Sequence, residues 1–355
     1  MNFDYNEEQQ LLADSVRRFL EKEYAFEARK KIVAGEGWSP AVWRSFAEMG
    51  LLGLPLPAEQ GGFGGGAVDL MGVMEAFGEA LVVEPYLATL IAARLIARGG
   101  TDEQKRTLLP AVAEGRMKLA FAHDEKGARY RLDHVNVKAE NGVLKGEKTA
   151  VLGAPLAERL VVSARTSAGI ELFIVEKPQL KPHTTLDEML AADLVLSGVK
   201  GEALCGGLAA IEEAVDFATA LVCAEAVGAI KFACDTTLEY LKTRKQFGVP
   251  IGTFQALQHR MVEMFISYEQ AKSMACLAAS KVDTAASAKD RARSVSMAKL
   301  KIADNARHVS QESVQLHGGM GMSEELKVSH TFRRLTVLAR QFGDADHHLA
   351  RLAAA

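Results

Sequence analysis

Polar and aromatic side chains gather at a break between two apolar helical segments, in Tyr240–Gln258 (YLKTRKQFGVPIGTFQALQ). The first segment ends near Arg244, and the second begins near Gln255, because proline shortly after glycine is a helix-stop signal. Arginine offers a planar fork of donors, glutamine an amide donor and phenylalanine an apolar ring face. This corner is therefore suited to an anion and a planar ring. Charged loops between helices are usually only solvated, so the interpretation needs a second site along the chain.

A second candidate segment is Gln315–Glu325 (QLHGGMGMSEE), which follows another long helical pattern. Gln315 is a further amide donor. Gly318 and Gly319 would let backbone N–H groups approach a ligand closely.

The chain has 355 residues, of which 48% are hydrophobic and 25% charged, with a formal net charge of −3. These values are ordinary for a globular protein of two or three structural units. They give no electrostatic basis for binding nucleic acid or an anionic membrane, and charges interrupt the longest apolar runs before membrane-spanning length. The cysteines lack CxxC spacing, which predicts buried free thiols and a cytoplasmic location. The acidic start, MNFDYNEEQQLL, is unlike a secretory leader.

Hydrophobic patterning divides the chain into helical, strand-rich and helical parts. The first part predicts amphipathic helices at Asn6–Tyr24, Pro40–Met49, Val68–Ala80, Pro85–Arg98 and Asp102–Glu114. Short β-rich runs separated by Asn-Gly and Gly turns predict one antiparallel sheet or barrel. Long Ala/Leu/Met-rich segments then predict a four-helix bundle from Leu208–Thr243, Gln255–Val282, Ser287–Leu316 and a shorter final helix. We expect a mainly α protein with a central β-domain, divided into domains 1–116, 117–207 and 208–355.

Four stretches, in this order, resemble motifs of the acyl-CoA dehydrogenase family: MGLLGLPLPAEQGGFGGG, GTDEQKRTLLPAVAEGRMKLAFA, YLKTRKQFGVPIGTFQALQHRMVEM and QLHGGMGMSEE. Together they extend over essentially the whole chain. The resemblance implies an N-terminal helical domain, a middle β-barrel-like domain and a C-terminal four-helix bundle. It also implies α,β-dehydrogenation of an acyl-CoA by FAD, with an electron-transfer flavoprotein as acceptor.

In this family each FAD is shared between two subunits, so that one β-domain holds the isoalloxazine and the neighbouring bundle holds the ADP half. Matching the motifs residue by residue carries the bundle's FAD contacts over to Arg244, Gln246, Phe247, Gln255, Gln315, Gly318 and Gly319. Arg244 would supply the charged fork for a pyrophosphate.

The sequence departs from the family's pattern where a flavin ring would be bound. The family's T-E-P-x-x-G-S-D falls on HDEKGARY, so that its threonine, proline, serine and aspartate are replaced by His123, Glu125, Arg129 and Tyr130. The family's W-I-T falls on Ala150, Val151 and Leu152, which removes an aromatic cover and a hydroxyl donor. The resemblance therefore implies that this chain's own flavin-binding side is lost.

The family's catalytic glutamate is also absent. Its Y-E-G motif falls on Gln341–Gly343, so that Phe342 occupies the glutamate position. Asp344 and Asp346 are weak substitutes, because a shorter side chain displaced by two residues would not reach the same α-carbon. The family's alternative position for this glutamate falls on Ala218. We therefore expect this chain to have no catalytic base of its own.

Glu225 lies in an almost uncharged helical stretch, LVCAEAVGAIKFAC. Burial with a raised pKa would make it a candidate base, whereas a helix-surface or subunit-interface carboxylate is the commoner case. His123, His317 and the His347–His348 pair lack metal-ligand spacing, so no metal site is expected and these histidines are expected at the surface or an interface.

These features lead to one hypothesis and its alternatives. The chain is similar to the small subunits of heteromeric acyl-CoA dehydrogenases, including those for pimeloyl-CoA and for steroid side-chain CoA thioesters. A larger partner subunit would then supply the glutamate and the flavin pocket. The first alternative is a self-sufficient homo-oligomer that uses Asp344, Asp346 or Glu225 as base. Others are a non-catalytic scaffold and a different flavin reaction, such as nitroalkane oxidation.

Overall fold

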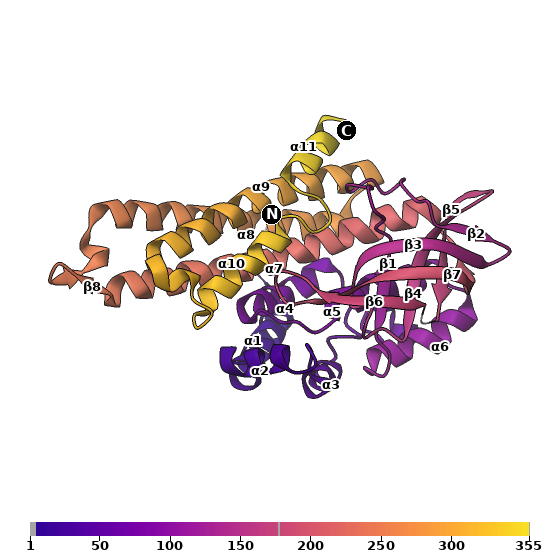
Figure 1. Cartoon of the computed structure of the whole chain (residues 1–355), viewed down its shortest axis with the longest axis horizontal. Coiled ribbons are helices and arrows are strands. Elements are labelled where there is room, and N and C mark those ends of the chain that lie inside the picture. The colour runs from indigo at the N-terminus through magenta and orange to yellow at the C-terminus, as the bar shows by residue number, and fades with distance from the viewer. Residues whose placement is uncertain (1–4, 177, 355) are drawn as a thin grey trace. The chain divides into compact units, whose positions relative to one another are not determined.

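A computed structural model describes residues 5–176 and 178–354, so the first four residues of the acidic N-terminal segment lie outside the described residues. The expected order of helices, strands and helices is confirmed (Figure 1). The N-terminal helices are α1 (Glu7–Glu23), α2 (Phe26–Ala34), α3 (Pro40–Glu48), α4 (Ala67–Ala80), α5 (Tyr86–Gly99) and α6 (Asp102–Ala113). The strands are β1 (Leu119–Ala122), β2 (Lys138–Glu140), β3 (Val143–Leu152), β4 (Arg159–Thr166), β5 (Gly169–Val175), β6 (Gln179–Thr184) and β7 (Leu190–Leu204). The C-terminal helices are α7 (Gly207–Thr243), α8 (Gln255–Thr284), α9 (Ala288–His317), α10 (Lys327–Leu338) and α11 (Ala345–Ala353).

Local capping explains why several helices begin where they do. Asn6 and Thr101 each form a capping box with the glutamine three residues later, Gln9 and Gln104, which satisfies two otherwise unpaired backbone donors at each start. Helix α2 was not predicted. Its sequence has little amphipathic pattern, and its buried side chain is Arg29, whose Nε donates to Leu81 O at 2.7 Å.

By contact the chain forms two compact units. The first comprises residues 1–30, 67–82 and 219–355, and the second comprises residues 31–66 and 83–218.

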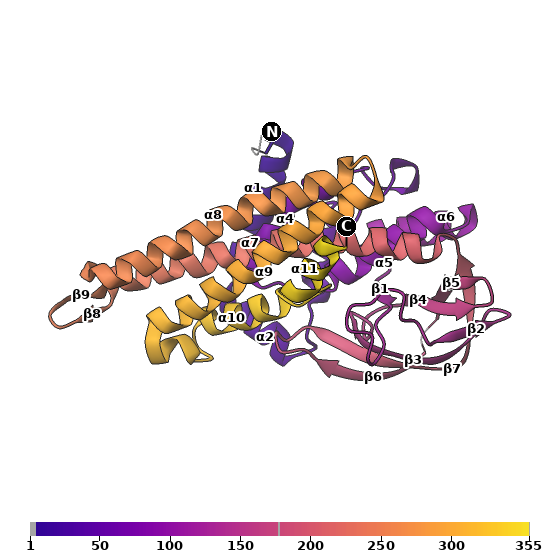
Figure 2. The same ribbon diagram turned by 90° about the horizontal axis from the view of Figure 1, so that it is seen from above.

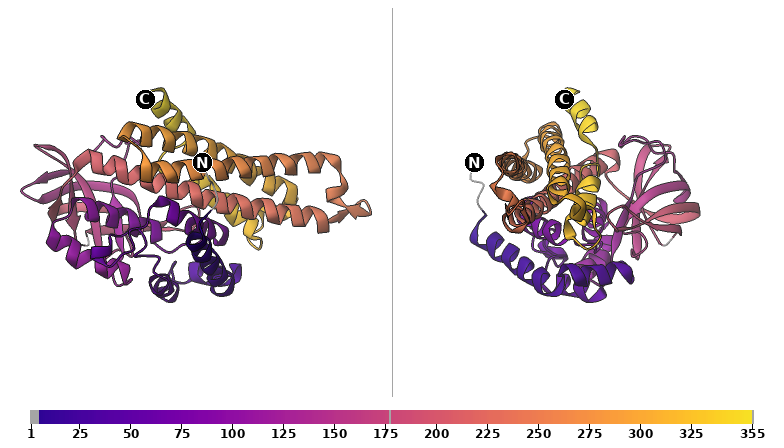
Figure 3. Two further views of the ribbon diagram at one scale, coloured as in Figure 1. Left: turned by 180° about the vertical axis from the view of Figure 1, so that it is seen from behind. Right: turned by 60° about the vertical axis from the view of Figure 1, so that its left-hand side comes forward.

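The second unit contains the sheet. Strands β4, β2, β3, β7 and β5 close into a ring because β5 also pairs with β4, which agrees with the barrel-like domain expected (Figure 3). Most pairs are antiparallel, but β1 and β2 both run parallel to β4. The expectation of a wholly antiparallel sheet was therefore wrong at β4. Parallel pairing requires a long connection, and residues 123–137 carry the chain from β1, on one side of β4, to β2 on the other.

The first unit is a helical bundle in which α7, α8 and α9 lie side by side (Figures 1 and 2). Helices α4 and α7 cross with their backbones in contact, because each helix has a glycine at the crossing point. A Cβ on Gly78 would lie 1.9 Å from Glu225 O, and one on Gly228 would lie 1.9 Å from Glu75 O. Any larger side chain would push the helices apart. At the other end of α8, the Asp283 carboxylate accepts from Ala67 N and Val68 N at 2.9 and 3.0 Å and so caps α4.

Helix α7 is the one helix among the described residues that is long and apolar enough to cross a membrane. Its most apolar window has a mean hydropathy of 1.6, and 89% of that window is buried inside the fold. Such burial is typical of a core helix, so the helix is weak evidence for membrane insertion.

Candidate functional site

The predicted break between helices is present at one end of the bundle. Helix α7 ends at Thr243, β8 (Lys245–Gln246) pairs with β9 (Val249–Pro250), and a 3-10 turn leads into α8 at Gln255. Ile251 N donates to Arg244 O at 2.8 Å and closes the hairpin. Phe247 lies at the hairpin tip with φ +54° and is 90% exposed. The hairpin therefore presents an aromatic ring and the start of α8 to the surroundings.

Helix packing brings the two predicted segments together. The Tyr240 ring, one turn before Arg244, stacks on the His317 ring with centroids 4.4 Å apart and planes at 28°. One turn earlier, Thr237 Oγ1 and Ser313 Oγ are 2.9 Å apart. Because His317 directly precedes Gly318, the end of α7 and the glycine turn after α9 lie at the same end of the bundle.

The polar side chains predicted to bind FAD are exposed and available. In the part of the chain that the structure describes, no hydrogen bond or ion pair engages the side chains of Arg244, Gln246, Gln255 and Gln315. A Cβ on Gly318 or Gly319 would meet no atom within 4 Å, so their backbone is open to a ligand. This set of a guanidinium, amides and open backbone fits the phosphate-bearing half of a dinucleotide.

The β-domain residues in the flavin-binding motif positions are, in contrast, already engaged. His123 is 6% exposed, and its Nδ1 lies 2.9 Å from Ser163 Oγ. Glu125 is 8% exposed and forms an ion pair of 2.8 Å with Lys148, which is fully buried. Ala150 occupies a bulge of β3 with φ +51°. The side chains of His123 and Glu125 do not fit the contacts that a flavin ring needs, because their polar atoms already bond to Ser163 and Lys148.

Two of the three weak candidates for a catalytic base, Glu225 and Asp344, have structural partners. Glu225 is 2% exposed, and Arg334 Nε of α10 donates to its Oε1 at 2.7 Å; a position on the helix surface was therefore wrong. Asp344 caps α11, because its Oδ1 accepts from His347 N at 2.9 Å. Asp346 is exposed in the first turn of α11. Phe342 has φ +59°, and its carbonyl lies 3.2 Å from His348 Nε2.

The histidines are more buried than expected. His123, His317 and His348 are 6%, 3% and 1% exposed, so the expectation of surface positions was wrong for them. Burial, together with the Lys148 ammonium, lowers the pKa of His123 to about 3, which leaves this ring neutral. Among the described residues no group of three or more His, Cys, Asp or Glu could hold a metal ion.

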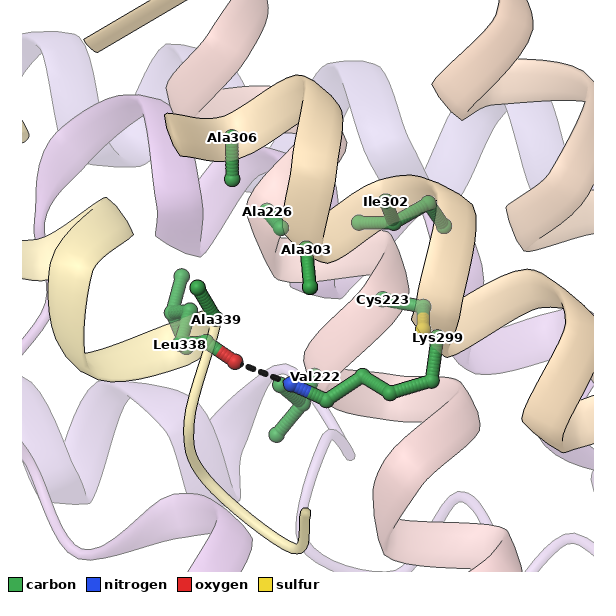
Figure 4. Close-up of a pocket in the computed structure, with 9 residues that line it drawn as sticks. All are labelled: Val222, Cys223, Ala226, Lys299, Ile302, Ala303, Ala306, Leu338 and Ala339. Atoms are coloured by element: carbon green, nitrogen blue, oxygen red, sulfur yellow. Dashed lines mark hydrogen bonds between the residues drawn. The ribbon is translucent and has the colours of Figure 1, made fainter. Parts of the chain in front are cut away.

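A small pocket lies within the bundle, away from the candidate site. Its lining is shown in Figure 4 and comes from α7, α9 and the end of α10; it includes Cys223, Lys299 and Leu338. Its interior has no room for a water molecule. The Lys299 ammonium is buried there and donates to Leu338 O, so it holds the end of α10 to α9.

Replacing Lys299 by Met should remove a pH dependence of stability. Burial lowers the pKa of Lys299 to about 8, although Cys223 and Asp344 oppose this, so the folded state releases its proton before the unfolded state does. We expect wild-type stability to rise relative to Lys299→Met between about pH 8 and pH 10.5, by roughly 3 kcal/mol in all. Urea unfolding from pH 7 to pH 10 would show this trend, with the exposed Lys301→Met as control. Equal slopes for wild type and Lys299→Met would contradict it.

Comparisons with known proteins agree with these observations. The acyl-CoA dehydrogenase N-terminal domain matches residues 6–116, and the acyl-CoA dehydrogenase C-terminal domain matches residues 206–355. The chain belongs to the acyl-CoA dehydrogenase family. Members of this family of flavoprotein oxidoreductases include 3-(aryl)acrylate reductase of Clostridium sporogenes, which is 30% identical over 369 residues and covers 96% of each chain.

Two solved structures resemble the chain over nearly its whole length. A variant of the Tcur3481-Tcur3483 steroid ACAD has a TM-score of 0.91 and 29% identity, and covers 98% of this chain and 97% of that chain. The ChsE4-ChsE5 complex from Mycobacterium tuberculosis has a TM-score of 0.92 and 26% identity, and the match covers 100% of this chain and 98% of that chain. The name of each structure joins two protein names.

The buried polar contacts of Lys148, in the β-domain of this member of the acyl-CoA dehydrogenase family, were not predicted from the sequence. The signal was present, since this lysine interrupts a strand in which Leu144 and Val151 are buried. Its partners are 15 to 25 residues away in sequence, and no local pattern connects them.

Proposed function

We propose that this chain is a subunit of a heteromeric, FAD-dependent acyl-CoA dehydrogenase, and that it completes a flavin site held mainly by a larger partner subunit. In this proposal Arg244, Gln246, Phe247, Gln255, Gln315, Gly318 and Gly319 contact the ADP half of the partner's FAD. The partner provides the catalytic glutamate and the pocket for the isoalloxazine. Bound FAD would accept a hydride from the acyl-CoA, and an electron-transfer flavoprotein would reoxidise it. The location would be cytoplasmic.

One observation carries the proposal: the two halves of a shared flavin site differ in this chain. The bundle half has an unengaged guanidinium and amides beside open glycines. In the β-domain half, His123 and Glu125 already bind Ser163 and Lys148, and the motif match assigns Phe342 to the family's glutamate position. A chain that had lost all function would not be expected to keep only one half.

Exposed apolar side chains at the same end of the bundle support a permanent partner. They lie at the hairpin, along α8 and in the glycine turn, and are Phe247, Val249, Phe254, Val262, Phe265, Ile266, Met320 and Met322. Large exposed apolar patches mark interaction sites. The two-protein names of the steroid ACAD and the ChsE4-ChsE5 complex favour a partner of the same fold. The acyl group could be bulky or dicarboxylic, as in steroid side-chain or pimeloyl thioesters.

The chain produced by itself should be colourless and should not oxidise acyl-CoA. Its FAD content would be measured by absorbance, and its turnover with an artificial electron acceptor. Production together with a larger homologue that keeps the family's glutamate and flavin motifs should give a yellow, active complex. A yellow protein that turns over without a partner would overturn the proposal and favour the homo-oligomer. A complex without FAD would favour the scaffold.

A further inference from the structure

A buried cluster in the β-domain, outside the candidate FAD contacts, joins a lysine to three groups from two other chain segments. Lys148 on β3 is fully buried, and its Nζ donates to His123 O at 3.0 Å, Glu125 Oε1 at 2.8 Å and Ser163 Oγ at 2.8 Å. An ammonium has three N–H donors, so this lysine has a partner for each. Such saturation is what permits a charge to remain in the protein interior.

Ser163 and the His123 ring complete the cluster. The Ser163 hydroxyl oxygen accepts from Lys148, which leaves its hydrogen free to be donated to His123 Nδ1, 2.9 Å away. His123 also stacks on Phe121 with ring centroids 5.6 Å apart. The lysine is therefore fixed in position by neutral groups, and Glu125 supplies the negative charge that it faces.

The Glu125 carboxylate makes the contacts that a free carboxylate ligand would make in a binding site. Its Oε2 accepts from Asn136 N at 2.7 Å, and its Oε1 accepts from Val137 N at 3.0 Å as well as from Lys148. Two backbone N–H groups and an ammonium thus converge on one carboxylate. Burial raises the pKa of Glu125, but the Lys148 ammonium and the two backbone donors outweigh it, so that the pKa lies below its ordinary value. These three donors form a binding site for a carboxylate, which we call the seat. None of the three belongs to Glu125 itself, so the seat does not depend on a covalent bond to the carboxylate that it holds.

Glu125 belongs to an irregular stretch that its side chain fastens at both ends. Residues 124–137, all described, contain no helix or strand. We call this stretch the strap. Gly127, Arg129 and Tyr130 have φ of +87°, +45° and +68°, and consecutive left-handed residues other than glycine are strained. The carboxylate joins the start of the strap to its end at residues 136 and 137. Contacts of this kind are needed to keep a strained segment in one conformation.

We propose that Glu125 is an internal ligand that latches the strap, and that its seat accepts a small free carboxylate when the Glu125 side chain is removed. The seat consists of Lys148 Nζ and the backbone N–H groups of residues 136 and 137. With Glu125 in place, the strap covers Lys148, and no external anion reaches it. The latch thus closes the β-domain of this subunit to carboxylate ligands, whether or not the chain shares a flavin with a partner.

The test is hydrogen exchange of the full-length chain carrying Glu125→Ala, read at peptides from residues 124–137. We expect exchange in the strap to be roughly 100-fold faster or more, because a buried charge has lost its partner. Sodium formate should slow it roughly tenfold when present at ten times its Kd, and an equal concentration of sodium chloride should not. Glu147→Gln, on the exposed side of β3, is the matched control and should exchange as wild type does.

Two results would overturn the latch. One is strap exchange in Glu125→Ala that equals wild type. The other is an equal response to formate and chloride, which would indicate general ionic stabilisation. If Glu125→Ala does not fold, Glu125→Gln keeps one acceptor oxygen and should show a smaller acceleration, confined to the same peptides. The readout needs neither FAD nor a partner, so failure of this proposal and failure of the proposed function are distinguishable.

Discussion

Replacing Arg244 by Ala should strip FAD from the two-subunit complex while both subunits remain folded and associated. The guanidinium is exposed and unengaged in the described chain, so its removal breaks no internal contact. A charge-assisted pair with a pyrophosphate is worth about 2–3 kcal/mol, which corresponds to roughly 30- to 150-fold in the Kd for FAD. Equilibrium dialysis or flavin fluorescence on the purified complex would measure this loss.

Matched variants make the Arg244 result specific. Lys242→Ala removes an exposed cation from the same turn of α7, where Lys242 Nζ binds Glu239 at 2.8 Å, and should leave FAD affinity nearly unchanged. Arg244→Lys should be intermediate, because an ammonium cannot form the two-pronged contact of a guanidinium. Unchanged FAD occupancy in Arg244→Ala would show that the bundle end is not the dinucleotide site. Assembly, followed by size-exclusion chromatography, should be the same for all three variants.

Replacing Glu225 by Ala should destabilise the bundle by about 3–5 kcal/mol, since it removes the carboxylate that the buried Arg334 guanidinium binds. Both side chains are nearly inaccessible, at 3% and 7% exposure. The backbones of α4 and α7 are in contact beside this pair, at Gly78 and Gly228, so the folded structure leaves little room there for water. Urea unfolding followed by circular dichroism would measure the change.

The double variant Glu225→Met with Arg334→Met should recover much of that stability, because a buried ion pair contributes little over well-packed apolar side chains. Asp235→Ala, which breaks an exposed pair with Lys231 on the same helix, should change stability by less than about 1 kcal/mol. If Glu225→Ala unfolds like wild type yet abolishes turnover of the chain alone, Glu225 would be acting as a base and the self-sufficient enzyme would be favoured.

Most of the helices, the central sheet and the position of the break were predictable because their causes are local. The capping residues Asn6 and Thr101 and the glycine-proline stop after Arg244 act within a few residues of where they occur. The candidate FAD contacts came from the family resemblance. The structure adds that Tyr240 and His317 bring their two segments together, a contact between residues far apart in sequence. Whether these residues bind FAD stays a prediction.

The parts that sequence reasoning missed depend on distant partners. His123 looked like a surface residue, but Ser163 and Lys148, 40 and 25 residues later, provide it with a buried polar environment. The parallel strands beside β4 follow from the path of residues 123–137, which no periodicity predicts. Glu225 could not be assigned without Arg334, which is 109 residues away.

The contacts between α7 and α9 constrain where insertions can occur. Thr237 pairs with Ser313, and Tyr240 with His317, so α7 and α9 point in the same direction and advance together turn by turn. One residue inserted into α9 after Ser313 would rotate everything beyond it by about 100° and turn Gly318 away from Arg244. One residue inserted into the α8–α9 connection at 285–287 leaves that helical phase unchanged. Homologues that keep this site should therefore differ in length at the connection and not within the last turns of either helix.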